Sequence, residues 1–263
     1  TVSVIPTKGN LNTGLFNTTI GNLACNNPEP ATGGGPGDSA QDIKLNAIAN
    51  FSAQKRTVTK EDYIFRALSM PPQFGKVAKA YIVQDTQISL DTNKRMSNPN
   101  ALNLYTVGYN YTKKLDPLSF AAKTNLATYL EQYRMLTDAI NIKEASVINF
   151  KIEFDISVKS GFSNDQVLLS AINNLKSFFN TDNWQINQPI NIGDISSLLY
   201  SIDGIQTANN IVLTNLFGEN SGYSKFKYNF DAAIRNGTLY PSLDPSIFEL
   251  KYPNTDIIGR VTN

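Results

Sequence analysis

The sequence predicts an α+β fold with mixed, mainly antiparallel sheets and amphipathic helices. Three patterns predict this class. Two extended segments, 77–84 and 102–111, flank a polar stretch typical of a long hairpin loop. Residues 148–159 alternate strictly between apolar and polar side chains, which predicts a strand with one buried and one wet face. Apolar residues at three- and four-residue spacing predict helices before and after these strands.

The chain is predicted to begin with an arm or long loop at residues 1–38. This region contains Pro6, Pro28, Pro30 and Pro36 and a glycine-rich run that includes Gly33 and Gly34. Both residue types interrupt helices and strands. The glycine run lacks the lysine and hydroxyl residue of a phosphate-binding loop, so it does not predict a nucleotide site.

Two helices are predicted after the arm, each beginning at a residue whose hydroxyl can accept a backbone hydrogen bond. The first begins at Ser39 and the second at Thr59, with Asp42 and Asp62 at their third positions. Carboxylates there lie near the positive end of the helix dipole. The Pro71–Pro72 pair is expected to end the second helix.

A third and longer helix is predicted from Asp116, because proline at position 117 suits a first helical turn. Its apolar stripe is Leu118, Ala122, Leu126, Tyr129, Tyr133, Leu136 and Ile140. Tyrosine is enriched at protein interfaces, so Tyr129 and Tyr133 are candidates for a contact with a partner. Packing inside the chain is the alternative.

The sequence pattern of the rest of the chain predicts elements in the order β-α-β-α-β, followed by a last strand. These elements are a strand at 148–159, a helix at Ser163, a strand at 189–192, a helix capped by Asp194, and strands at 211–213 and 247–252. Ser163 and Gln166 have the spacing of a capping box. We therefore expect two α+β subdomains after the arm, at residues 39–145 and 146–263.

The composition of the chain argues against several classes of function. A net charge of +1, from 23 basic and 22 acidic residues, predicts no attraction to nucleic acid or to an anionic membrane. No apolar run approaches the length of a membrane span. The single cysteine, Cys25, cannot form a disulfide within the chain or a zinc site by itself.

The sequence contains no candidate catalytic centre. It has no histidine, which excludes the triads and metal sites that need one within this chain. The acidic pairs Glu61/Asp62 and Glu153/Asp155 have local explanations, as a helix start and as the wet face of a strand. We therefore expect no enzyme activity, cofactor, metal or small-molecule substrate.

One ordered set of motifs resembles the baseplate J-like family. It consists of the run Thr32–Ser39, the Ile43-Lys44 pair in the predicted helix, and the segment Phe51–Tyr63, which contains Arg56-Thr57-Val58-Thr59-Lys60-Glu61-Asp62-Tyr63. The segment Leu198–Ile205 is similar to that family's later junction between a helix and a strand. Pro36 and the Pro71–Pro72 pair depart from the family pattern. The residues that carry the resemblance are Gly33, Gly34, Arg56, Thr59, Glu61, Asp62 and Tyr63.

The resemblance implies a structural function. Overall the chain is similar to the C-terminal part of the ring-forming baseplate wedge subunit of T-even-like bacteriophages. It implies a virion protein of the contractile tail, assembled in the host cytoplasm, that contacts itself in a dimer or ring and other wedge proteins. The alternative is a binding module for a receptor or a carbohydrate, using exposed aromatic side chains such as Trp184.

Overall fold

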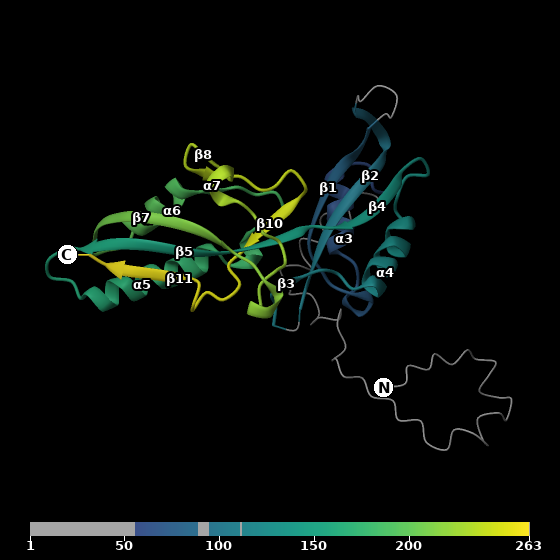
Figure 1. Ribbon diagram of the computed structural model, residues 1–263. Coiled ribbons are helices and arrows are strands. Elements are labelled where there is room, and N and C mark those ends of the chain that lie inside the picture. Colours follow the sequence, from purple (N-terminus) through teal and green to yellow (C-terminus); the bar gives the residue numbers. More distant parts are fainter. Residues whose placement is uncertain (1–55, 89–94, 111, 263) are drawn as a thin grey trace, which may run out of the picture. The chain divides into compact units, whose positions relative to one another are not determined.

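The computed structural model describes residues 56–88, 95–110 and 112–262, and the side chains of these residues except 85–88 and 95–100 (Figure 1). These residues belong to one compact unit, Gly33–Asn263. The predicted arm at 1–38 and the helix predicted from Ser39 lie outside the described residues. No helix among the described residues is long and apolar enough to cross a membrane.

A first sheet is built around a long hairpin. Its strands are β1 (Val77–Ile88), β2 (Arg95–Tyr109), β3 (Leu115–Asp116) and β4 (Ala139–Glu144). β2 pairs antiparallel with β1 and β3 and parallel with β4. The hairpin is confirmed, but the predicted loop is too long, because Asn98 and Pro99 already belong to β2.

Two helices cover one face of this sheet. They are α3 (Lys60–Leu68) and α4 (Phe120–Glu131), which contact each other and pack on β1 and β4 respectively; the short 3₁₀ turn η1 (Pro72–Phe74) follows α3. The shared core contains Tyr63 and Ala67 from α3, Leu126 and Leu130 from α4, and Leu104 from β2. All five side chains are fully or almost fully buried.

The predicted start and length of the long helix are wrong. Asp116 ends β3, consistent with the extended backbone favoured before proline, and Ser119 caps α4 by accepting the Ala122 N–H at 3.3 Å. The helix ends at Glu131, so Tyr133 and Leu136 lie in the following loop. Leu136 is 96% exposed, because the apolar stripe continues in sequence beyond the residues that are helical.

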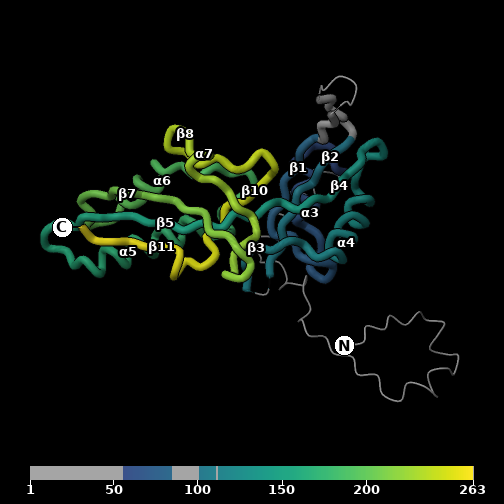
Figure 2. The backbone as a smooth tube through the Cα atoms, in the orientation of Figure 1, coloured from purple at the N-terminus to yellow at the C-terminus, as the bar shows by residue number. Residues whose placement is uncertain are grey.

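A second sheet is centred on β5 (Ser146–Val158). β7 (Ile205–Leu216) pairs antiparallel with β5, and β10 (Ser246–Glu249) and β11 (Ile257–Val261) pair parallel with it. The chain passes from β4 through Ala145 directly into β5, a path that Figure 2 traces. The alternation of β5 is confirmed from Phe150 to Ile156, but Asn149 is buried instead of wet.

Helices α5 (Asn164–Phe178) and α6 (Ile192–Tyr200) pack against this second sheet. The predicted capping box of α5 is wrong, because Ser163 makes no side-chain hydrogen bond at the helix start. In α6 the cap is Asn191, which accepts the Gly193 N–H at 3.0 Å, and Asp194 lies in the first turn. Gly204, at φ 95°, returns the chain toward β7 with a conformation that glycine adopts freely.

The predicted order β-α-β-α-β is confirmed along the chain, but its three strands do not share a sheet. The middle strand, β6 (Ile190–Asn191), belongs to a small antiparallel sheet with β9 (Thr238–Leu239), which also pairs with β8 (Ile234–Arg235). The short helix α7 (Phe230–Ala233) precedes β8. The 3₁₀ turns η2 (Thr181–Asn183) and η3 (Glu219–Ser221) complete the described elements.

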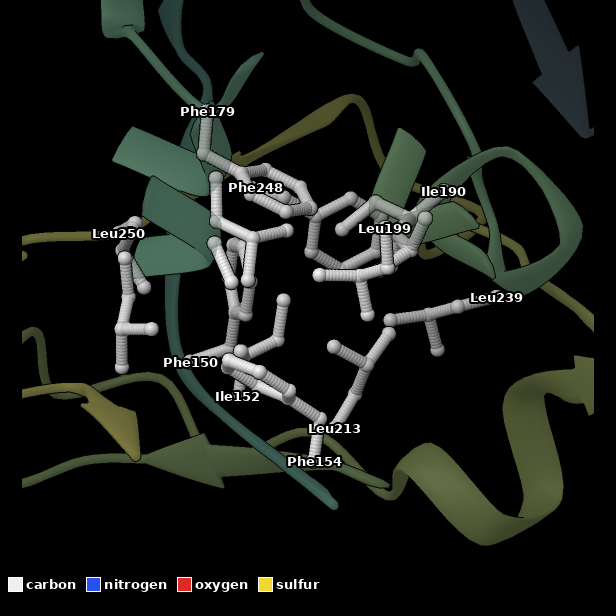
Figure 3. Packing of buried hydrophobic residues seen from close by; sticks show 14 of the residues in the cluster. Phe150, Ile152, Phe154, Phe179, Ile190, Leu199, Leu213, Leu239, Phe248 and Leu250 are labelled. Atoms are coloured by element: carbon white, nitrogen blue, oxygen red, sulfur yellow. The ribbon is translucent and has the colours of Figure 1, made fainter. Parts of the chain in front are cut away.

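The core of the second sheet is rich in phenylalanine. Phe150, Phe179 and Phe248 meet edge to face, with ring centroids 5.2 Å and 6.4 Å from that of Phe150 (Figure 3). Leu199 of α6 and Leu213 of β7 belong to the same cluster. Together, the helices and the strand pairings described above confirm the predicted α+β class with mixed, mainly antiparallel sheets.

A third and smaller core joins the two sheets. It contains Val107 and Leu115 from the first sheet, Val147 and Ile247 from the second, and Ile186 from the loop before β6. The division into subdomains at residue 145 stays a prediction, although the chain leaves the first sheet and enters the second at that residue.

Candidate functional site

The described part of the family motif forms a helix cap. Thr59 Oγ1 accepts the Asp62 N–H at 3.2 Å, and Asp62 Oδ2 accepts the N–H groups of Val58 and Thr59 at 3.1 Å and 2.9 Å. These bonds from the backbone of Thr59 and Val58 lower the pKa of Asp62. Thr59 and Asp62 thus act as predicted at the start of α3, with the reciprocal bonds of a capping box.

The same motif anchors the loop between α4 and β4. The buried Tyr63 hydroxyl donates to Asp138 Oδ2 at 2.6 Å. Thr57 donates to the Tyr133 carbonyl twice, from its backbone N–H at 3.0 Å and from its hydroxyl at 2.9 Å. Burial and the bond to Asp138 raise the pKa of Tyr63. The motif therefore joins segments that are far apart in the sequence.

The two candidate interface tyrosines pack against each other. The ring centroids of Tyr129 and Tyr133 are 5.1 Å apart, and the guanidinium of the buried Arg66 lies 4.4 Å from the Tyr133 centroid. Burial and the neighbouring Tyr133 raise the pKa of Tyr129 to about 12. Both side chains are half-buried within the chain, and their contact with a partner stays a prediction.

The remaining motif residues have less defined surroundings. Arg56 is exposed, and the three ion pairs of the described residues involve neither Arg56 nor Glu61. Arg56 thus forms no ion pair with Glu61 or Asp62. Gly33 and Gly34, like Cys25, lie outside the described residues.

The acidic pair on β5 has ordinary neighbours. Glu153 pairs with Lys151 and, at 3.7 Å, with Arg260, and Asp155 accepts the Asn210 amide at 2.8 Å. The hydrogen bond and charge of Lys151 lower the pKa of Glu153. Among the described residues, no cluster of Asp, Glu, Cys or His could hold a metal ion.

A buried carboxylate that the sequence analysis missed lies where the two sheets meet. Glu249 of β10 is 2% exposed. Its oxygens accept the Leu115 N–H at 2.8 Å and the Asn149 amide at 2.9 Å, while Asn149 Oδ1 accepts the Ser224 N–H at 2.7 Å. Burial raises the pKa of Glu249. The sequence signal that could have indicated this buried site is the presence of two polar residues, Asn149 and Glu249, next to strongly apolar strand residues.

A second polar contact joins the first sheet to the turn η2, which follows α5. The buried Lys79 of β1 donates from Nζ to the Asp182 carbonyl at 2.7 Å, and the Tyr109 hydroxyl of β2 donates to Asp182 Oδ1 at 2.9 Å. Burial lowers the pKa of Lys79 and raises that of Tyr109. Because each of these groups has a hydrogen-bond partner in the chain, we interpret these interactions as structural contacts.

Trp184 is not available for a ligand, which corrects the alternative of an aromatic binding site at this residue. It is 6% exposed, stacks on Phe179 at 5.4 Å between centroids, and donates from Nε1 to the Phe178 carbonyl at 3.0 Å. An indole that is buried and hydrogen-bonded in this way belongs to the core.

Two grooves indent the described surface. The first, about 350 Å³, lies between α4 and β4 and includes Ala127, Leu136 and Ile142 in its lining. The second, about 980 Å³, lies beside the small sheet and includes Tyr228 and Tyr240. Neither contains a buried cluster of acidic or nucleophilic side chains of the kind that catalysis requires.

No protein-family model matches the chain, and no curated protein sequence matches it. Among solved structures, the chain is similar to a chain in the cryo-EM structure of the anti-feeding prophage (AFP) baseplate, symmetrised six-fold. The match has 13% sequence identity and a TM-score of 0.44, and it covers 86% of this chain. It spans 42% of the other chain. This likeness is too distant to establish a shared fold, and the resemblance to the baseplate J-like family stays a prediction.

Proposed function

We propose that this chain is a non-catalytic structural part of a contractile-tail baseplate wedge. In this proposal it belongs to the virion, is assembled in the host cytoplasm, associates with itself in a dimer or ring, and joins neighbouring wedge proteins. Its action depends on the shape of its surfaces, and no bond is made or broken.

The main support is that side chains of the motif Arg56–Tyr63 form structural contacts within the chain. Thr57, Thr59, Asp62 and Tyr63 all make contacts that hold α3 to its own start and to the loop before β4. The hydrogen bonds of these four residues are satisfied within the chain, so these four polar side chains are not held in reserve for a substrate. The same residues carry the family resemblance, which is why a structural role is favoured over a catalytic one.

Self-association is the part of the proposal that is most easily tested. Sedimentation velocity of the chain should show concentration-dependent dimers or larger rings. Electron microscopy of mixtures with candidate wedge proteins should show joint particles. A strict monomer at every concentration tested would contradict the proposal.

The predicted interface near Tyr129 and Tyr133 can be probed without disturbing their packing. A photo-crosslinking amino acid placed at Met135, which is exposed beside Tyr133, should give a cross-link between copies. The same group at the exposed Asp203 provides the control. Equal cross-linking from both positions would show that the contact is not specific to this region.

A further inference from the structure

The turn between β8 and β9 is an exposed Asn-Gly pair with a defined backbone geometry. Asn236 and Gly237 link Arg235 of β8 to Thr238 of β9, and these two strand residues face each other in the pairing. The φ angles of Asn236 and Gly237 are 50° and 75°. Two positive φ angles at the central residues are the mark of a type I′ turn, the hairpin turn that favours Asn-Gly. Both residues are exposed to solvent.

Little restrains the reactive groups of this turn. Among the described residues, the Asn236 side chain has no hydrogen-bond partner, and the Gly237 N–H donates no hydrogen bond. Apart from its chain neighbours, no heavy atom lies within 4 Å of the position that a Cβ of residue 237 would occupy. The Gly237 nitrogen can therefore approach the side-chain carbonyl carbon of Asn236 without breaking a hydrogen bond.

The change of backbone that this approach requires is small. For the Gly237 nitrogen to bond to Asn236 Cγ, the peptide plane between the two residues must rotate. Rotation of that plane converts a type I′ turn into a type II′ turn, which keeps a positive φ at the first central residue only. Glycine adopts either sign of φ, and both turn types suit a hairpin. The pairing of β8 with β9 can thus persist while the ring forms.

We propose that Asn236 is a site of spontaneous deamidation. The Gly237 nitrogen attacks Asn236 Cγ and loses its proton, a C–N bond forms, and the side-chain nitrogen leaves as ammonia. Water then opens the succinimide ring. Breaking the bond from nitrogen to Cγ gives aspartate, and breaking the bond to the main-chain carbonyl carbon gives isoaspartate. The inference rests on the geometry of the turn and does not depend on the proposed baseplate role.

The two products should differ in their effect on the fold. Asp-Gly also suits a type I′ turn, so aspartate should preserve the hairpin while adding a negative charge next to Arg235 in the sequence. Isoaspartate leads the main chain through Cβ and Cγ of residue 236, which lengthens the backbone between β8 and β9. The Gly237 carbonyl accepts the Ile192 N–H at 2.9 Å, at the start of α6. Isoaspartate should displace this carbonyl and loosen the start of α6.

The test is incubation of the whole chain in mildly alkaline buffer, followed by digestion with trypsin and mass spectrometry. Cleavage after Arg235 and Lys251 releases a peptide in which Asn236 is the only asparagine. The mass gained when an amide becomes an acid is therefore assigned to Asn236 without ambiguity. A sample digested before incubation corrects for deamidation during digestion. The peptide should convert into an aspartyl and an isoaspartyl product of equal mass, which chromatography separates.

Asn210 provides a matched control within the same chain. It is exposed and has a positive φ of 51°, but its amide donates to Asp155 at 2.8 Å, and the branched side chain of Ile211 crowds the attacking nitrogen. Conversion at Asn236 should be at least about tenfold faster than at Asn210, which corresponds to about 1.4 kcal/mol in activation free energy. Asn236→Gln should leave the peptide unconverted over the same period, because glutamine must close a larger ring.

Stability separates the two products. The isoaspartyl form, purified by ion exchange, should unfold at a lower urea concentration than Asn236→Asp, which should keep the wild-type midpoint. Equal midpoints would contradict the expected effect on α6. Two results would overturn the proposed site itself. One is conversion of Asn236 no faster than that of Asn210, and the other is an unconverted Asn236 in the folded chain after the urea-unfolded chain has converted completely.

Discussion

At the scale of single residues, Tyr63 is the side chain that ties the family motif to the rest of the first sheet. It is 1% exposed, and its hydroxyl donates to a carboxylate of the loop that follows α4. A hydrogen bond between a neutral donor and a charged acceptor is stronger than one between neutral groups. We therefore expect the hydroxyl, and not only the ring, to contribute to stability.

Tyr63→Phe tests that contribution. Removing the hydroxyl leaves Asp138 without this donor, and the free energy of unfolding should fall by about 1–3 kcal/mol. Urea denaturation measures the change. Tyr200→Phe is the control: its half-exposed hydroxyl lies 3.5 Å from the Ala208 carbonyl, so its loss should change stability by less than about 0.5 kcal/mol. Equal effects of both substitutions would contradict a particular contribution of the Tyr63 hydroxyl to stability.

At the scale of elements, α4 shows where a sequence pattern stops being informative. Its stripe is apolar from Leu118 to Ile140, yet the helix covers only Phe120–Glu131. Leu126 is fully buried under the sheet, whereas Leu136 projects from the loop beside the groove. The periodicity matches the helix only within Phe120–Glu131, and it could not show that Tyr133, Leu136 and Ile140 lie beyond the helix.

The pair Leu126→Ala and Leu136→Ala distinguishes the two parts of that stripe. Leu126→Ala leaves a cavity in the core and should lower the free energy of unfolding by about 2–5 kcal/mol. Leu136→Ala should change it by less than about 0.5 kcal/mol, because the side chain is already in water. Thermal or urea unfolding followed by circular dichroism provides the measurement. A large loss with Leu136→Ala would indicate that this side chain is buried by a partner.

Some local signals were predicted well, although the caps of α5 and α6 and the start of α4 were not, and the long-range pairings were not predicted. The Thr59 cap, the alternating β5 and the β1–β2 hairpin depend on neighbouring residues, so the sequence shows them directly. The pairing of β5 with β10 and β11, and the separation of β6 into another sheet, depend on contacts between distant segments. The tail strand β11 was missed, because Ile257–Val261 includes Gly259 and Arg260 and lacks alternation.

The candidate site was predictable only in part for the same reason. The capping role of Thr59 and Asp62 follows from their spacing, and both residues fill it. The partners of Tyr63 and Glu249 are 75 and 134 positions away, and no local pattern indicates them.

We expect the stability of the protein to depend on pH through Glu249 in β10. Its folded pKa is raised above the ordinary value of 4.5 by burial, so the folded state holds its proton more tightly than the unfolded state does. The resulting stability is present below the unfolded pKa and is lost as pH rises through the folded pKa. Relative to Glu249→Gln, which does not titrate, wild-type stability should therefore fall as pH rises from about 4.5 toward neutrality.

Urea denaturation of both proteins at a series of pH values from about 4.5 upward gives the difference at each pH. Like the protonated acid, the Gln side chain has one carbonyl acceptor for the Leu115 N–H and a donor on its other atom, so the two proteins should differ least at the acidic end. A wild-type stability that stays constant relative to the Gln variant, or that rises relative to it toward neutrality, would contradict the raised pKa.

At the scale of the whole molecule, the two sheets share both apolar and polar contacts. The small core around Val107, Leu115 and Val147 contains residues of both sheets. Glu249 of the second sheet accepts the Leu115 N–H of the first, and Lys79 of the first sheet donates to Asp182 in η2. Buried polar groups whose partners lie on another element are costly when that element unfolds alone. The sheets should therefore unfold together.

The single tryptophan allows that coupling to be measured. Trp184 stacks on Phe179 in the core of the second sheet, so its fluorescence reports on that sheet, while circular dichroism reports on all elements. The two urea transitions should coincide in the wild-type chain, and Leu126→Ala, in the core of the first sheet, should lower both midpoints equally. Leu136→Ala should move neither. A Trp184 transition that keeps its wild-type midpoint in Leu126→Ala would mean that the contacts of Lys79, Glu249 and the shared core do not couple the two sheets.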